Sequence, residues 1–407
     1  MHIRSLALLG IATIVAVSTR APLLAQHVHT NRPRGQQLLP LPEEDGVWHF
    51  VVYGDRTGGP PEGIEVLAQA VKDTNLLDPD LVMTVGDLVQ GYNAPPLWMA
   101  QMKEFKETMA GLRMPWFPVP GNHDIYWRGA DRPFGHHEEN YETHFGPLWY
   151  WFPHKDAAFI VLYTDEGNLE TGDKGFARKG VDDMSPAQLE WLGQTLKETQ
   201  DYRHVFVFVH HPRWLPNYFG NWDAVHDLLK KPGNVTAVFA GHIHRAIYSG
   251  VRDGIEYLTL GTTGGYKDHD VPRAGWMHHY DVVTVRERGV QVAAIPVGQV
   301  VDPRGLTEAH LTDLQKLIEG DVVRVPDPLI LQGDGSVGAM LKVSIENPSG
   351  QPVESTLLID AGAEGWFVRP DHLHLKLRPG ASESATFEFL RAPGSFPERV
   401  PRFALKT

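Results

Sequence analysis

The chain has 407 residues, of which 42% are hydrophobic and 21% are charged, a balance typical of a globular protein long enough to form two domains. Its formal charge of −13 argues against a nucleic-acid-binding surface as the main function. Because the chain contains no cysteine, disulfides, thiolate metal sites and cysteine nucleophiles are excluded.

The first 25 residues have the pattern of an export signal. Met1–Arg4 is a short basic start, and Leu6–Val17 is an apolar stretch of signal-peptide length. Residues 18–20 are polar and interrupt this stretch, so it is too short for a permanent membrane span. We therefore expect residues 1–25 to be the signal peptide of a periplasmic or secreted protein, and residues 26–45 to be a leader or linker.

Between residues 46 and 300, apolar β-prone runs alternate with helical patterns. The predicted strands are residues 48–53, 80–85, 116–119, 158–163, 205–209 and 235–240. The predicted helices are residues 63–76, 97–112 and 185–199. This alternation favours an α/β domain in which helices cover the sheets.

Five short polar motifs follow one another along this region, and nearly all of them come directly after an apolar run. They are Gly54-Asp55-Arg56, Gly86-Asp87, Gly121-Asn122-His123-Asp124, Val207-x-x-His210-His211 and Gly241-His242-Ile243-His244. Their position predicts that the polar side chains lie at the carboxyl ends of strands, where open α/β sheets bind ligands. Two carboxylates, an amide and three imidazoles form the ligand inventory of a two-metal hydrolytic centre.

Oxygen and imidazole ligands suit two divalent metal ions such as manganese, iron or zinc. We expect Asp87 to bridge the two ions and Asp55 and His244 to complete one site. The other site would be completed by Asn122, His210 and His242. On an extended segment the two histidines around Ile243 would point the same way, because side chains alternate along a strand.

Hydrolysis at such a centre also needs a proton donor for the leaving oxygen. His123 is the predicted general acid, with Asp124 accepting its other ring proton and fixing its orientation. Arg56 is a candidate for a bidentate phosphate contact, and a structural salt bridge is an equal alternative. Each motif alone has a structural interpretation, because Gly-Asp is a common turn and loop histidines bond to backbone. The order, spacing and strand-end context of all five together favour the metal centre.

These motifs resemble those of the calcineurin-like metallophosphoesterase superfamily over roughly Val47–Val297. The resemblance implies a four-layer α/β/β/α sandwich, two divalent metal ions, and attack of a metal-bound hydroxide on a small-molecule or protein phosphoester.

The first motif departs from the superfamily pattern. The superfamily has histidine two residues after the first aspartate, where this chain has Thr57. Purple acid phosphatases also lack that histidine and use a tyrosine three residues after the bridging aspartate, where Gln90 stands in this chain, with Tyr92 two residues further on. Gln90 is therefore a candidate amide ligand, and a water molecule is the alternative.

The pattern changes after residue 300. Residues 301–320 have helical periodicity and predict a linking helix. Short alternating segments at residues 339–345, 353–359, 373–377 and 384–390 are separated by turn signals. They predict a small all-β sandwich domain over residues 321–407, next to the α/β domain of residues 46–300.

The leading hypothesis is thus an exported metal-dependent phosphoester hydrolase. One alternative is a nucleotide or cyclic-nucleotide phosphodiesterase. An alternative of another class is a non-catalytic binding or scaffold protein that keeps the fold. Thr57 favours the scaffold, whereas the His123-Asp124 pair and the six remaining ligands favour the enzyme.

Overall fold

The computed structural model describes residues 46–59, 62–176, 178–360 and 365–406. The predicted signal peptide and the predicted leader lie outside these residues. The contacts divide the chain into two units, Met1–Gln299 and Val300–Thr407. None of the helices in the described ranges combines the length and the apolar character that crossing a bilayer requires.

The first unit contains two sheets. The strands of the first sheet are β1 (Trp48–Tyr53), β2 (Leu81–Thr84), β3 (Trp116–Phe117), β10 (His279–Arg286) and β11 (Gly289–Pro296). They are arranged in the order β11-β10-β1-β2-β3. β1, β2 and β3 are parallel, whereas β10 is antiparallel to both β1 and β11.

The second sheet has the order β4-β5-β6-β7-β9-β8. Its strands are β4 (Tyr150–His154), β5 (Ala157–Val161), β6 (His204–Phe208), β7 (Val235–Ala240), β8 (Ile247–Arg252) and β9 (Ile255–Thr259). The four central strands are parallel, and the two edge strands β4 and β8 are antiparallel to their neighbours.

The two sheets pack face to face on an apolar core. Phe50 of β1 lies between the sheets, with its ring 5.1 Å from that of Phe159 and 5.0 Å from that of Phe206 (centroid distances). Every residue of β5 and β6 is buried, as expected for strands covered on both faces.

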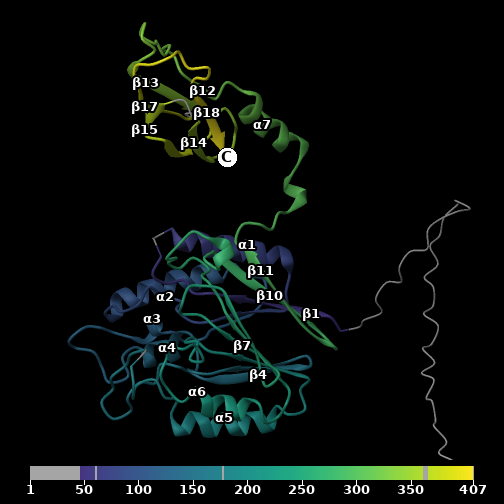
Figure 1. Ribbon diagram of the computed structural model, residues 1–407. Coiled ribbons are helices and arrows are strands. Elements are labelled where there is room, and N and C mark those ends of the chain that lie inside the picture. The colour runs from purple at the N-terminus through teal and green to yellow at the C-terminus, as the bar shows by residue number, and fades with distance from the viewer. Residues whose placement is uncertain (1–45, 60–61, 177, 361–364, 407) are drawn as a thin grey trace, which may run out of the picture. The chain divides into compact units, whose positions relative to one another are not determined.

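Helices cover the outer faces, so the unit has the predicted four layers, α/β/β/α (Figure 1). α1 (Gly63–Leu77) and α2 (Pro95–Met109) lie outside the first sheet, and α5 (Pro186–Glu198) and α6 (Trp222–Leu229) lie outside the second. The short helices α3 (Asn122–Ile125) and α4 (Glu138–His144) lie at the edge of the sheets. On the second sheet, Leu192 of α5 and Val225 of α6 pack against the outward residues of β5, β6 and β7. On the first sheet, the Tyr53 hydroxyl lies 2.8 Å from Thr74 Oγ1 of α1.

In its described residues the second unit is all-β apart from one α-helix and a short 3-10 helix (Pro303–Gly305), and its strands form the two sheets of a sandwich. The sheets have the orders β12-β13-β17-β15 and β16-β14-β18. The elements are α7 (Glu308–Glu319), β12 (Val323–Arg324), β13 (Val337–Glu346), β14 (Val353–Asp360), β15 (Trp366–Arg369), β16 (His372–Leu377), β17 (Ser382–Arg391) and β18 (Arg402–Lys406). Ile345, Leu357 and Phe387 are fully buried between the sheets. The α7 helix is tied to this unit, since Gly350 N donates to Asp313 Oδ2 at 2.7 Å.

Candidate metal centre

The five motifs follow strands of both sheets and meet at one edge of the first unit. Asp55 follows β1, Asp87 follows β2, and Asn122 opens α3 after β3. From the second sheet, His210 follows β6, and the segment with His242 and His244 follows β7. These strands run parallel within each sheet, so their carboxyl ends gather the polar side chains in one place.

One group of potential ligands consists of Asp55, Asp87 and His244. One potential ligand atom of each lies within 4.8 Å of those of the other two. His244 Nδ1 lies 2.8 Å from the Tyr266 carbonyl oxygen and donates its proton there. Nε2 therefore faces the site, where it lies 3.1 Å from Asp55 Oδ2, and it is the nitrogen that could bind a cation.

A second group lies around His210. The Nδ1 atom of His210 donates a hydrogen bond to the Val85 carbonyl oxygen at 2.8 Å, and this contact directs Nε2 into the site. Nε2 lies 2.9 Å from Asn122 Oδ1 and 3.3 Å from Asp87 Oδ1. The His242 ring lies 5.1 Å from that of His210 (centroid distance), and both have a ligand atom in the same group.

Asp87 connects the two groups. It belongs to the group with Asp55 and His244 and lies beside His210 of the other group. Burial lowers the pKa of His210, but the neighbouring Asp87 carboxylate outweighs burial and raises this pKa to about 10. Burial raises the pKa of Asp87, but the imidazoles of His210 and His123 outweigh it and hold this pKa well below its usual range. The carboxylate is thus ionised at neutral pH.

The donor set fits two divalent cations. Asp55 Oδ1 is buried and has no hydrogen-bond partner within the described ranges, although a buried carboxylate oxygen normally has one. Gly241 lies against this oxygen, and a Cβ atom there would overlap it. A cation at this point would complete the coordination of an oxygen that the protein itself leaves unpaired.

His242 and His244 do not lie on an extended segment, so that prediction is wrong. Both residues have left-handed backbone conformations, with φ angles of 71° and 53°. Ile243 N donates to the Gly241 carbonyl oxygen at 2.9 Å, which closes a tight turn. The turn sends the two imidazoles to different groups, and this separation is what two cations require.

The predicted pairing of Asp124 with His123 is also wrong. Asp124 Oδ1 accepts hydrogen bonds from Leu88 N and Val89 N, and its Oδ2 accepts one from Gly121 N. Asp124 therefore holds the loop that carries Asp87. His123 Nδ1 instead lies 2.5 Å from the Gln90 carbonyl oxygen and 2.8 Å from Thr57 Oγ1. Thr57, which stands where the superfamily has histidine, thus contacts His123.

Arg56 is buried and forms the structural salt bridge that was the alternative to a phosphate contact. Its Nη2 lies 3.5 Å from Glu104 Oε2 of α2. Burial lowers the pKa of Arg56, and Glu104 partly opposes that effect. Only 5% of the side chain is exposed, and Nη1 is buried with no hydrogen-bond partner among the described residues, so the phosphate contact stays a prediction.

The Gln90 side chain has a backbone partner. Its Oε1 accepts a hydrogen bond from Gly58 N at 2.8 Å, and its carbonyl oxygen contacts His123. Gln90 therefore connects the first motif to His123, and its role as an amide ligand stays a prediction. Tyr92 contacts a predicted ligand directly, since its hydroxyl accepts a hydrogen bond from Asn122 Nδ2 at 2.6 Å.

The sequence prediction assigned no role at the centre to two buried residues beside it, His211 and Asp165. His211 has a potential ligand atom within 4.8 Å of those of His210 and His242. Its Nε2 lies 2.8 Å from Asp165 Oδ1. Asp165 follows the apolar run of β5, so the strand-end signal that indicated Asp55 and Asp87 was present here as well.

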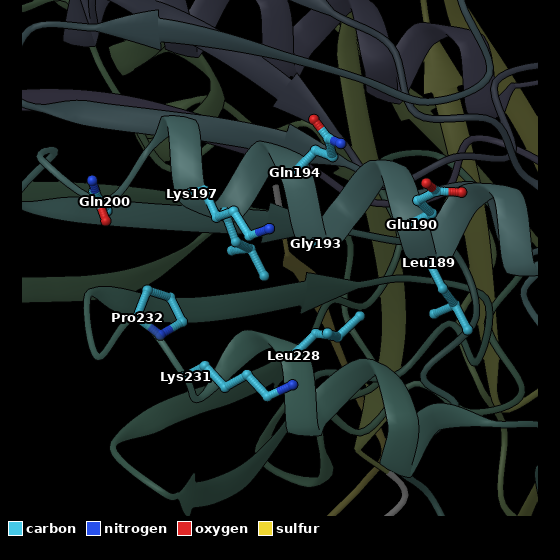
Figure 2. Close-up of a pocket in the computed structure, with 10 residues that line it drawn as sticks. Leu189, Glu190, Gly193, Gln194, Lys197, Gln200, Leu228, Lys231 and Pro232 are labelled. Atoms are coloured by element: carbon cyan, nitrogen blue, oxygen red, sulfur yellow. The ribbon is translucent and has the colours of Figure 1, made fainter.

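The pocket drawn in Figure 2 lies elsewhere, between α5 and α6. It has a volume of about 550 Å³ and includes Leu189, Lys197, Leu228 and Lys231. The ends of these two helices lead into the beginnings of β6 and β7, whereas the ligands follow the ends of those strands. This pocket is therefore separate from the candidate metal centre.

Comparison with known proteins places the site in a family. Residues 48–246 match the family described as calcineurin-like phosphoesterase. A probable glycerophosphodiester phosphodiesterase (GpdQ) from Arcobacter nitrofigilis is 28% identical over 41% of this chain and 57% of its own length. The 3',5'-cyclic adenosine monophosphate phosphodiesterase CpdA from Escherichia coli is 24% identical over 41% of this chain and 55% of its own length.

The matched regions thus span little more than half the length of these curated relatives. Among solved structures, a dimetal phosphatase from Danio rerio matches with a TM-score of 0.47 and 16% identity, over 62% of this chain and 100% of that chain. The family match contains all six predicted metal ligands. Residues 48–246 thus form a calcineurin-like phosphoesterase domain.

Proposed function

We propose that this protein is a metal-dependent hydrolase of phosphoesters that uses two divalent cations. The observation that carries this proposal is the convergence of potential ligand atoms from both sheets around Asp87. Asp55 and His244 lie on one side of Asp87, and His210 lies on the other. Manganese, iron and zinc all suit these oxygen and imidazole donors.

Two bound cations would activate a water molecule and neutralise charge on the phosphoryl group. The protein's own residues would position them. Asp55 and His244 would hold one cation, and Asn122, His210 and His242 would hold the other, with Asp87 between them. The carbonyl oxygens of Val85 and Tyr266 fix the imidazoles of His210 and His244 so that each presents Nε2.

We propose His123 as the donor of a proton to the leaving oxygen. Its Nδ1 is held by the Gln90 carbonyl oxygen, so Nε2 is the nitrogen available to a substrate. The Tyr92 ring packs edge-on against the imidazole at a centroid distance of 4.2 Å. These contacts orient the ring without Asp124, and in the protonated imidazolium Nε2 carries the transferable proton.

A phosphodiesterase activity is the second candidate. It is supported by the names of the two curated relatives, both of which are phosphodiesterases. The phosphoester hydrolase proposed first includes enzymes that cleave monoesters and enzymes that cleave diesters. The two are separated by comparing p-nitrophenyl phosphate with bis(p-nitrophenyl) phosphate.

The test is hydrolysis of both esters by metal-free protein to which manganese, zinc or ferrous iron is added. We expect metal-dependent turnover that is lost in Asp87→Ala and unchanged in Asp183→Ala, which alters an exposed aspartate. Turnover confined to the diester would select the phosphodiesterase. If the protein binds metal and cleaves neither ester nor cyclic nucleotides, the non-catalytic alternative is the better account.

Export is a separate proposal, supported by the basic start and apolar stretch within residues 1–25. Its test is amino-terminal sequencing of protein recovered from the cell exterior or periplasm. A terminus near residue 26 supports export, whereas recovery only from the cytoplasm with Met1 intact contradicts it.

A further inference from the structure

His211 is the second residue of the histidine pair that follows β6, and the metal assignment above does not use it. Its side chain is fully buried. Both ring nitrogens of a buried histidine need a partner, because an unpaired buried polar atom is costly. The two nitrogens of His211 differ sharply in this respect.

Nε2 of His211 has a well-defined partner. It lies 2.8 Å from Asp165 Oδ1, and the Tyr126 hydroxyl donates to the same oxygen at 2.5 Å. An ionised carboxylate only accepts hydrogen bonds, so Nε2 is the nitrogen that carries the proton. Nδ1 is then an acceptor with a free lone pair.

Nδ1 of His211 is buried and has no hydrogen-bond partner in the part of the chain that the structure describes. The His211 ring lies 4.0 Å from that of His242 and 4.8 Å from that of His210 (centroid distances). Potential ligand atoms of the three histidines lie within 4.8 Å of one another. The ring that carries this unpaired nitrogen is thus next to the two imidazoles already assigned to one cation.

We propose that His211 Nδ1 is a further ligand of the cation bound by His210 and His242, and that Asp165 and Tyr126 are positioning residues that fix its tautomer. This proposal rests on the proposed function, since it requires that the centre binds metal. A carboxylate that accepts the second ring proton of a ligating histidine is a common arrangement in metal sites.

The proposal makes the two cation sites unequal. The site around His210 gains an imidazole, whereas the site around Asp55 has Thr57 at the position where the superfamily has histidine. Thr57 Oγ1 is engaged with His123 Nδ1 at 2.8 Å. The first cation to bind should therefore occupy the site that contains His210, His211 and His242, and the second should bind more weakly beside Asp55.

The test is titration of the full-length metal-free protein with Co²⁺, monitored by calorimetry and by visible absorption. The absorption spectrum of Co²⁺ reports the ligands of the ion directly. We expect wild type to bind one tight and one weaker ion. His211→Ala should weaken the tight ion roughly 10–100-fold, change its absorption spectrum, and leave the weaker ion unaffected. Asp165→Asn should weaken the same ion by a smaller factor.

Two further variants make the result specific. His211→Asn places an amide oxygen near the position of Nδ1 and should therefore bind the tight ion better than His211→Ala does. Comparing the two variants also separates loss of a ligand from loss of folding. His226→Gln is the matched control, because His226 is a buried histidine with partners on both nitrogens, Tyr257 and Asp253. It should bind Co²⁺ as wild type does.

If wild type binds two ions and His211→Ala binds the tight ion with unchanged affinity and spectrum, the ligand role is overturned while the proposed function stands. If wild type binds no divalent ion, the proposed function is overturned, and the role of His211 with it. Thermal unfolding of each metal-free variant shows whether it is folded. A folded His211→Asn with intermediate affinity supports the proposal even where His211→Ala does not fold.

Discussion

Asp87 Oδ1 lies 3.3 Å from His210 Nε2, although Asp87 follows β2 of one sheet and His210 follows β6 of the other. The contact joins the two inner layers of the sandwich at the edge where the motifs converge. In the metal-free protein it is an ion pair, because the Asp87 carboxylate raises the pKa of His210 to about 10 against the effect of burial. A cation that binds both side chains must replace the proton that now holds them together.

We therefore predict proton release when metal binds. At pH 7.5 the metal-free protein carries a proton on His210, and a cation needs the lone pair of Nε2. Binding of Zn²⁺ should release about one proton or more per chain. Calorimetry in buffers of different ionisation enthalpy measures this number. Metal binding with no proton release would contradict the assignment of His210 as a ligand.

The second prediction concerns His123. His123→Ala should keep the bound metal and lower kcat roughly 10²–10⁴-fold, the usual contribution of a general acid. The loss should be larger for an alkyl phosphoester than for a p-nitrophenyl ester, because a poor leaving group depends more on protonation. His49→Ala, which alters an exposed histidine, is the control. An equal loss for both leaving groups would assign His123 to substrate binding instead of proton transfer.

The third prediction concerns Asp124, which accepts three backbone hydrogen bonds at 2.8–3.0 Å. Asp124→Ala leaves these buried N–H groups unpaired, at a cost of about 1–3 kcal/mol for each group that finds no new partner. Urea denaturation of the metal-free protein should show a loss of about 3 kcal/mol or more. Asp124→Asn keeps an acceptor and should lose less. If Asp124→Ala has wild-type stability and an altered pH–rate profile, Asp124 acts through His123 after all.

The fourth prediction concerns the pH dependence of stability. His136 Nδ1 accepts from Trp127 N at 3.0 Å, and Nε2 lies 3.2 Å from the Gly172 carbonyl oxygen. Burial, followed by the positive charges of Lys174 and Arg132, lowers the pKa of His136 to about 4. Below the ordinary histidine pKa of about 6.5 the unfolded chain takes up a proton that the folded protein does not, so stability falls as the pH falls.

For this residue alone, the free energy of unfolding should fall by about 2 kcal/mol between pH 7 and pH 5. His136→Gln should remove this part of the pH dependence, and His49→Gln, at an exposed position, should not. Urea denaturation of the three proteins at both pH values measures the difference. The same pH slope in wild type and His136→Gln would show that His136 is protonated in the folded protein.

Local sequence signals predicted the elements that position the centre. The apolar runs before Asp55 and before His242 correspond to β1 and β7 within a residue, because buried parallel strands are nearly continuous apolar segments. Ser185 and Pro186 correctly marked the start of α5, where the Ser185 side chain accepts a hydrogen bond from Gln188 N.

The β10–β11 hairpin was not predicted. β10 pairs with β1, more than two hundred residues earlier in the chain, and no local pattern encodes that pairing.

The wrong predictions at the site also concern features that the local sequence does not determine. The role of Asp124 depends on which backbone groups reach it, and adjacency in sequence wrongly suggested Asp124 as the partner of His123. The conformation of His242 and His244 depends on left-handed backbone angles that residue type alone does not predict for histidine. Asp165 carried the strand-end signal, but its partner His211 lies 46 residues away.

The most direct test of the central claim is the metal content of purified protein after loading with manganese, zinc or iron and removal of excess ion. Elemental analysis should find about two divalent ions per chain in wild type and in Asp183→Ala, and fewer than about one in Asp87→Ala. Two ions retained by a folded Asp87→Ala, or none bound by wild type under any of these conditions, would contradict a dinuclear centre shared through Asp87.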